Sequence, residues 1–304
     1  MGGWTTRDIP GLDGRRAIVT GANSGIGHHT ALWLARRGAS VVLACRSAER
    51  GRAAVDRIRA AAPDADVVLG PLDLADLSSV RAFAARHGDA PLDLLVNNAG
   101  VMALPRGTTA DGFETQFGTN HLGHFALTGL LLPALRAAPS ARVVTLTSGF
   151  AWTGRLRFDD LQGERGYGKW AAYAQSKLAN LVFAKELDRR VPGLTSVAAH
   201  PGYAATNLQQ AGPRMRGSTL MEKANGVANV LVAQSAATGA LPPLYAATAP
   251  DVQGGACYGP RLFQYRGAPV KVVTPPRADR PGQGERLWRI SEELTSVTYA
   301  SAPA

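Results

Sequence analysis

Short apolar runs alternate with longer helical patterns through roughly the first two hundred residues. The apolar runs are rich in Val, Leu and Ala on both faces, which is typical of parallel strands covered by helices on each side. They predict strands at 17–20, 40–44, 67–69, 94–97, 143–146 and 196–199. The patterns between and after them predict helices at 26–37, 48–62, 77–87, 113–137 and 171–190. This alternation predicts an α/β fold with a doubly wound parallel sheet.

The last third of the chain is less regular. Residues 203–221 are interrupted by Gly and Pro and show no clear period, so we interpret them as a substrate lid. A further helix is expected at 222–237 and a last strand at 255–258. No linker, repeat or change of composition marks a second domain. We therefore predict one Rossmann-type domain over 1–304, which includes the lid and a C-terminal tail at 261–304.

The composition is that of an ordinary globular protein except for its charge. Hydrophobic residues make up 45% of the chain and charged residues 18%, so the chain can bury a core. The formal net charge of +10 raises the question of a nucleic acid or a membrane surface as partner. The basic excess is spread along the whole chain instead of forming a stripe or cluster. We therefore expect no nucleic-acid partner.

Nothing in the sequence predicts export, membrane insertion or a metal site. The first residues are polar and lack the apolar core of a signal peptide, and the longest apolar stretch, 125–135, is too short to span a bilayer. The two cysteines form no disulfide framework, and no Cys/His cluster has the spacing of a zinc site. We expect a cytoplasmic protein without a membrane partner and without a metal.

A glycine-rich segment follows the first predicted strand and opens the first predicted helix. It reads Thr-Gly-Ala-Asn-Ser-Gly-Ile-Gly over residues 20–27. Glycines there allow a tight turn and a close approach of the backbone to a pyrophosphate, which binds at the helix N-terminus. The segment therefore predicts dinucleotide contacts from Gly21, Asn23, Ser24, Gly25, Ile26 and Gly27.

The residue after the second predicted strand bears on the choice of dinucleotide. An acidic side chain at this strand end would bond the ribose 2′-hydroxyl of NAD(H) and repel a 2′-phosphate. The strand end has no acid and carries Arg46, whose guanidinium can bind a phosphate with two parallel hydrogen bonds. This favours NADP(H) as the cofactor. Arg46 can also be read as an ordinary surface residue of an Arg-rich chain, so NAD(H) remains the alternative.

Tyr173 and Lys177 lie four positions apart on a predicted helix and therefore share one face. An ammonium beside a phenol favours the phenolate and lowers a pKa that is ordinarily about 10, which makes Tyr173 a candidate acid–base. Ser148 follows the fifth predicted strand, and Asn120 lies in the helix that follows residues 97–100. Because the ends of parallel strands meet at one edge of the sheet, we expect these four catalytic candidates to lie together.

Together these motifs resemble the short-chain dehydrogenase/reductase family. The matching positions run in order over residues 15–210 and are 20–27, Asp73, Leu74, 97–100, Asn120, Ser148, Tyr173, Lys177, Pro201, Gly202 and Thr206. Within the family the chain is most similar to the retinol-dehydrogenase-like branch, on segments 117–125, 177–180, 200–202, 286–288 and 294–295.

The resemblance implies a role for each matched residue. Tyr173 would exchange a proton with the substrate oxygen, Lys177 would lower the pKa of Tyr173 and hold the nicotinamide ribose, and Ser148 would polarise the carbonyl. Asn120 would hold its helix and a water that relays protons. The further dinucleotide contacts that it implies are Asp73 and Leu74 near the adenine, Asn98, Ala99 and Gly100 near the ribose, and Pro201, Gly202 and Thr206 near the nicotinamide.

These roles imply an NADP(H)-dependent oxidoreductase that interconverts an alcohol and a carbonyl on a small to medium substrate. Apolar residues in the lid favour an apolar substrate, although Arg214 and Arg216 could meet an acidic group. A non-catalytic dinucleotide-sensing protein is the alternative of another class. A monomer and a homodimer both remain open, because the segment between Ser148 and Tyr173 is long for the wider family and adjoins the helices that many members use to pair.

Overall fold

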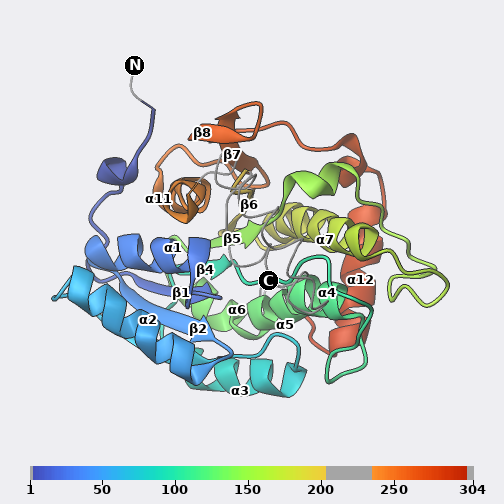
Figure 1. Ribbon diagram of the computed structural model, residues 1–304, viewed down its shortest axis with the longest axis horizontal. Coiled ribbons are helices and arrows are strands. Elements are labelled where there is room, and N and C mark those ends of the chain that lie inside the picture. The colour runs from blue at the N-terminus through green and yellow to red at the C-terminus, as the bar shows by residue number, and fades with distance from the viewer. Residues whose placement is uncertain (1–2, 203–234, 300–304) are drawn as a thin grey trace, which may run out of the picture.

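The computed structural model describes residues 3–202 and 235–299, which form a central sheet with helices on both faces (Figure 1). Within these ranges eight strands form one sheet in the order β3-β2-β1-β4-β5-β6-β7-β8. Strands β1 to β7 are parallel, and β8 pairs with β7 in the antiparallel sense. The order reverses between β1 and β4, which is the point where ligands bind in such sheets. The predicted doubly wound sheet is confirmed.

All six strands predicted in the first two hundred residues are present. Their bounds are β1 Arg16–Thr20, β2 Ser40–Cys45, β3 Val67–Pro71, β4 Leu94–Asn97, β5 Arg142–Leu146 and β6 Thr195–Ala199. The last predicted strand is β7 (Cys257–Leu262), but the sequence did not predict β8 (Arg266–Lys271). The turn that joins these two strands places Phe263 and Gln264 at positive φ, 50° and 59°. Neither is the glycine or asparagine that usually announces such a turn, so the hairpin had no signal.

Alternate residues of the strands face the two helical layers, which is the physical basis of the apolar runs. In β1, Ala17 and Val19 pack on one face, and Ile18 packs on the other. The first layer contains α1 (Gly25–Arg36), α2 (Ala48–Ala61) and α11 (Leu241–Thr248), preceded by the short α10 (Ala236–Gly239). The second contains α3 (Leu77–His87), α5 (Gly123–Leu130), α6 (Leu132–Ala137) and α7 (Lys169–Arg190).

The single helix predicted over 113–137 is divided in the structure. Short α4 (Thr115–Phe117) leads into a π turn, η2 (Gly118–Leu122), in which the amide of Gly123 donates to the carbonyl of Gly118. Helix α5 ends at Leu130, and after Leu131 the chain continues as α6, where Pro133 occupies the first turn. Proline lacks an N–H and fits only the first turn of a helix, so it starts a new helix instead of continuing the old one. Such π turns often mark functional sites.

The C-terminal tail is part of the folded layers. After β8 and a 3-10 turn, η4 (Pro276–Asp279), helix α12 (Gln283–Thr295) packs on α7 and buries Leu287 and Trp288. The interpreted lid at 203–221 lies outside the described residues, as does 222–234 of the helix expected at 222–237; Ser235 is the N-cap of α10. In the part of the chain that the structure describes, no helix combines the length and apolarity needed to cross a bilayer.

Candidate active site

A cleft of about 360 Å³ opens where β1, β2, β4 and β5 end. We call it the cofactor cleft. It brings together most of the residues that the sequence predicted, namely Gly21, Asn23, Ser24, Gly25, Ile26, Gly27, Arg46, Asp73, Leu74, Asn98, Ala99, Gly100, Tyr173, Lys177 and Pro201. It is also lined by residues that the sequence did not single out, namely Ala44, Ser47, Arg50, Leu72, Val101, Thr119, Leu146 and Thr147.

The glycine-rich loop is pressed closely against the loop that follows β4. Gly21 and Gly25 adopt φ of +67° and +58°, a conformation that suits glycine. A Cβ on Gly21 would lie 2.9 Å from the Cα of Ala99. A Cβ on Gly27 would lie 2.6 Å from the carbonyl oxygen of Gly21 and would collide with the side chain of Asn98. The N-cap Ser24 makes no side-chain cap bond, so the first-turn amides of α1 are left for an anion. These residues fit a dinucleotide pyrophosphate.

Two arginines stand at the end of the cleft formed by β2 and α2. Arg46 and Arg50 both line the cleft and are exposed. Among the described residues neither has an ion-pair partner. The sequence pattern did not single out Arg50, which lies in the first turn of α2, four residues after Arg46. The pair places two uncompensated positive charges where a phosphate could bind.

Tyr173 and Lys177 enter the cleft from α7, and both are buried. The Nζ of Lys177 donates to the carbonyl of Leu146 at 3.1 Å and lies 5.9 Å from the centre of the Tyr173 ring. The hydroxyl of Thr147 donates to the carbonyl of Lys177 at 2.7 Å. These bonds attach α7 to the end of β5, so the two reactive side chains face the same cleft as the glycine-rich loop.

Burial sets the protonation states of this pair. Burial raises the pKa of Tyr173 to about 12, although a hydrogen bond with the Ser148 hydroxyl lowers it by a smaller amount. Burial also lowers the pKa of Lys177 to about 8. The expected lowering of the Tyr173 pKa by Lys177 is therefore wrong for this structure. The low-dielectric surroundings disfavour the phenolate, and the ammonium is directed to Leu146. At neutral pH Tyr173 is a phenol and can donate a proton.

Asn120 lies behind the cleft instead of lining it. It is fully buried in the π turn, where its Oδ1 accepts from the amide of Val101 at 2.8 Å. Its Nδ2 donates to the carbonyl of Val101 at 2.9 Å and to the hydroxyl of Ser176 at 2.9 Å. A Cβ on Gly100 would lie 3.1 Å from Asn120 Oδ1 and 3.4 Å from Lys177 Nζ. Asn120 thus joins the loop after β4 to α7.

The remaining predicted residues fall at the margins of the site. Ser148 is half-buried at the end of β5, where its hydroxyl accepts from the amide of Phe150 at 3.3 Å. Gly202 follows the cleft residue Pro201, and its amide donates to the imidazole of His200 at 3.2 Å. Thr206 lies outside the described residues.

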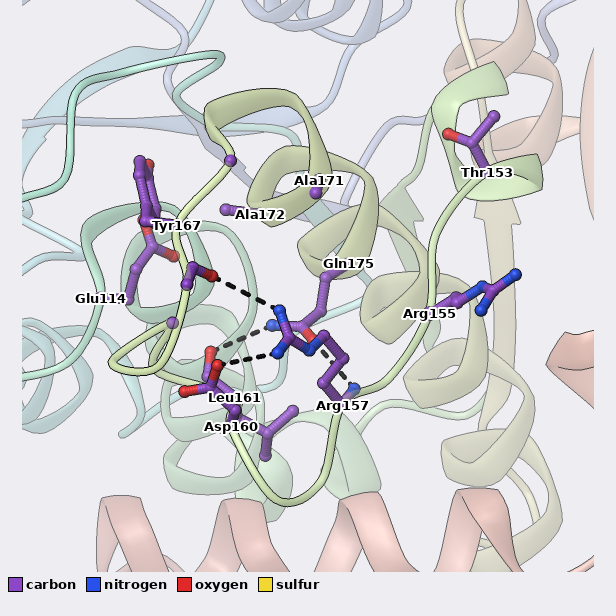
Figure 2. A pocket seen from close by; sticks show the side chains of 13 residues that line it. Glu114, Thr153, Arg155, Arg157, Asp160, Leu161, Tyr167, Ala171, Ala172 and Gln175 are labelled. Carbon is purple, nitrogen blue, oxygen red and sulfur yellow. Dashed lines mark hydrogen bonds and ion pairs between the residues drawn. The ribbon is translucent and has the colours of Figure 1, made fainter.

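A second, smaller cavity of about 80 Å³ lies between the segment after Ser148 and the start of α7 (Figure 2). We call it the insert pocket, lined mainly by residues 153–175 and by Glu114. Figure 2 shows Arg157 at its centre, directed towards Asp160. The guanidinium lies 3.1 Å from the Asp160 carboxylate. The side chain of Gln175 accepts from the amide of Arg157 at 3.0 Å and donates to the carbonyl of Leu161 at 3.0 Å. Arg157, Asp160 and Gln175 are thus bonded to other groups of the pocket, as expected of a structural loop.

The chain is similar to known dehydrogenases over nearly its whole length. The family described as short chain dehydrogenase matches residues 15–216. Retinol dehydrogenase 12 of Mus musculus is 40% identical, covering 98% of this chain and 91% of that protein. An uncharacterized protein of Mycobacterium paratuberculosis has a crystal structure with a TM-score of 0.82 and 44% identity, covering 98% and 99% of the two chains. A structure from Beutenbergia cavernae, titled as an NAD(P)-dependent gluconate 5-dehydrogenase with bound NADP at low occupancy, has a TM-score of 0.60 and 26% identity, covering 78% and 90%.

Proposed function

The chain belongs to the short-chain dehydrogenase/reductase family, in its retinol-dehydrogenase-like branch, and from this premise we propose that it interconverts an alcohol and a carbonyl on a small to medium, apolar substrate with NADP(H). An NAD(P)-dependent oxidoreductase acting on CH–OH and C=O groups follows from the family itself. The choice of NADP(H), the apolar substrate and the roles of individual residues are the proposal. So are a cytoplasmic location and the absence of nucleic-acid and membrane partners.

One observation carries the proposal: the glycine-rich loop and the buried pair Tyr173 and Lys177 line the same cleft. A bound dinucleotide supplies the hydride. As a carbonyl is reduced, negative charge develops on its oxygen, and the Tyr173 phenol can give that oxygen a proton while the Ser148 hydroxyl donates a hydrogen bond. Lys177 provides a buried positive charge beside them and a hydrogen-bond donor for a ribose hydroxyl.

The preference for NADP(H) rests on the charges at the β2 end of the cleft. Arg46 and Arg50 line it without an ion-pair partner among the described residues, and either guanidinium can bind a 2′-phosphate. No acidic residue follows β2 to bond a 2′-hydroxyl, since the chain continues with Arg46, Ser47 and Ala48. The related structure from Beutenbergia cavernae, described with bound NADP at low occupancy, supports this choice.

The apolar character of the substrate is supported by aromatic side chains beside Tyr173. Phe150 stacks on Trp170 with ring centres 5.2 Å apart and an interplanar angle of 14°. Phe150 also meets the Tyr173 ring edge-on at 5.6 Å. Both Phe150 and Trp170 remain substantially exposed, 40% and 45%, although they are large and apolar. An apolar substrate at Tyr173 would cover this surface and remove it from water.

The test is direct binding followed by a substrate panel. Purified full-length protein is titrated with NADPH and NADH by intrinsic fluorescence, and turnover on a panel of apolar and acidic carbonyls and alcohols is followed by the absorbance of the reduced dinucleotide. We expect tighter binding of NADPH and turnover confined to the apolar substrates. Tighter binding of NADH would refute the cofactor assignment, and preference for acidic substrates would refute the substrate class.

A further inference from the structure

A buried histidine, His124 on α5, lies between the end of β1 and the π turn that carries Asn120. Its side chain is fully enclosed, with Nε2 2.9 Å from the hydroxyl of Thr20 and Nδ1 2.9 Å from the carbonyl oxygen of Asn120. His124 does not line the cofactor cleft. Any influence on a bound dinucleotide must therefore act through these two neighbours.

Thr20 holds one end of the loop that follows β4. Its hydroxyl accepts from the amides of Asn98 and Ala99, both at 2.9 Å, and its carbonyl accepts from the side chain of Asn98 at 2.7 Å. The next residue, Gly21, begins the glycine-rich loop. Thr20 therefore sets the distance between the two loops that face the dinucleotide.

Asn120 holds the other end of the same loop. Its side chain makes two hydrogen bonds to the backbone of Val101 and one to Ser176 on α7. Residues 98–101 are thus fixed at their start by Thr20 and at their end by Asn120. His124 connects these two attachments.

A count of protons assigns the tautomer of His124. A threonine hydroxyl has two lone pairs and one proton. The amides of Asn98 and Ala99 use both lone pairs of the Thr20 hydroxyl. Its proton is therefore donated to His124 Nε2 at 2.9 Å, because the other possible acceptor, the carbonyl of Val96, is more distant at 3.4 Å. Nδ1 then carries the ring proton and donates to Asn120. Burial lowers the pKa of His124 to about 4, which keeps the ring in this neutral form.

We propose that His124 is a positioning residue for dinucleotide binding. Its two hydrogen bonds hold residues 98–101 and Asn120 in place beside the glycine-rich loop. The inference rests on the proposed function, because it assumes that the cleft binds a dinucleotide. Loss of the bond to Thr20 would leave its hydroxyl only the more distant carbonyl of Val96 as acceptor, and loss of the other bond would remove a donor from the carbonyl of Asn120. Either change would loosen residues 98–101.

His121 offers a matched control in the same segment. It is also fully buried and neutral, since burial lowers its pKa to about 3. Its Nε2 lies 2.9 Å from the hydroxyl of Ser291 on α12, and its ring packs with Phe117 and Phe183. It is directed to α12 and has no bond to the loops of the cofactor cleft among the described residues.

The experiment compares His124→Phe with His121→Phe in the full-length protein. Thermal unfolding, NADPH titration and kcat are measured for each. Both variants should melt below the parent, but only His124→Phe should raise the NADPH dissociation constant, by about tenfold, and lower kcat. Equal NADPH binding by His124→Phe and the parent, or equal loss in both variants, would overturn the inference. A parent that binds no dinucleotide would refute the proposed function instead.

A second pair keeps the inference testable if His124→Phe does not fold. Thr20→Val preserves the shape of the side chain and removes the hydroxyl, whereas Thr20→Ser retains the hydroxyl. We expect Thr20→Val to weaken NADPH binding by about tenfold and Thr20→Ser to recover most of that loss. Equal binding by Thr20→Val and Thr20→Ser would show that the hydroxyl does not position the loop.

Discussion

The cofactor cleft and the insert pocket both contain arginine and tyrosine side chains, but these side chains differ in whether they have bonding partners. In the insert pocket Arg157 pairs with Asp160 at 3.1 Å and donates to the carbonyl of Gly166 at 3.4 Å. In the cofactor cleft Arg46 and Arg50 have no ion-pair partner among the described residues. A paired guanidinium has its charge balanced, whereas an unpaired one can bind an incoming anion. The presence of a bonded partner therefore distinguishes Arg157 from the two arginines that we propose bind the 2′-phosphate.

The two tyrosines of these regions differ in the same way. Burial raises the pKa of both Tyr167 and Tyr173 to about 12, so both are phenols at neutral pH. The Tyr167 hydroxyl donates to the carbonyl of Leu104 at 2.9 Å and accepts from Gln116 at 2.9 Å. Tyr173 instead lines the cleft with Ser148 in reach. The Tyr167 hydroxyl is used in holding the fold, whereas the Tyr173 hydroxyl faces the cleft, where we propose that it exchanges a proton with the substrate.

The largest expected effect is on the tyrosine of the cleft. Tyr173→Phe removes the proposed proton donor and should lower kcat by about 10²–10⁴-fold. The dinucleotide dissociation constant should change little, because the glycine-rich loop is untouched. Kinetics on an active substrate and an NADPH titration check both expectations. Tyr167→Phe is the control with the same atoms removed, and comparable loss of kcat in the two variants would break the distinction between the regions.

Reversing the charge of a cleft arginine should have the next largest effect. Arg46→Asp removes a phosphate partner and adds a carboxylate that repels the 2′-phosphate, so the preference for NADPH over NADH should fall by about 10- to 100-fold. The ratio of the two dissociation constants is the measurement. Arg157→Ala, in the insert pocket, should leave that ratio unchanged. An unchanged ratio in Arg46→Asp would remove Arg46 from the phosphate site.

The lowered pKa of Lys177 predicts a pH dependence of smaller size. Lys177 is charged below its pKa of about 8 and neutral above it. The kcat/KM for the dinucleotide reports the free protein, so it should be constant below that pH and fall by roughly tenfold at pH 9. The Arg157→Ala variant should show the same profile, since its change lies in the insert pocket. A profile that is flat from pH 7 to pH 10 would contradict a role for the Lys177 charge.

The smallest expected effect is on stability in the insert pocket. Tyr167→Phe leaves Gln116 and the carbonyl of Leu104 without this partner, so the free energy of unfolding should fall by about 1 kcal/mol. Urea unfolding followed by fluorescence measures the change. Tyr173→Phe should cost less, because its hydroxyl faces the cleft. A larger loss of stability in Tyr173→Phe would reverse the assignment of the two tyrosines.

Much of the fold could be predicted because the strands repeat one simple pattern. Runs such as 17–20 and 143–146 are apolar on both faces, since each strand is covered by helices from both layers. Strand β8 was missed because its turn contains Phe263 and Gln264 instead of glycine. The break between α5 and α6 was also missed, although Pro133 was visible, because the apolar pattern continues across it.

The site was predicted as a set of residues but not as an electrostatic environment. Local motifs identified the glycine-rich loop and the pair Tyr173 and Lys177, which the cofactor cleft does bring together. Arg50 was not singled out, and His124 entered only as part of the segment 117–125, because the bond between His124 and Thr20, far apart in the sequence, depends on the tertiary structure. The direction of the Tyr173 pKa was wrong because it depends on burial, which the spacing of two residues does not report.

The sequence by itself determined the alternating fold, the family and the chemical types at the cleft, because these follow from periodicity and from short motifs along the chain. Only the tertiary structure decided which arginines are paired, which tyrosine faces the cleft, and which bonds link Thr20, His124 and Asn120. These properties depend on distances of a few ångströms between residues far apart in the chain. Hydrogen bonding and burial act over such distances, and local sequence pattern does not specify them.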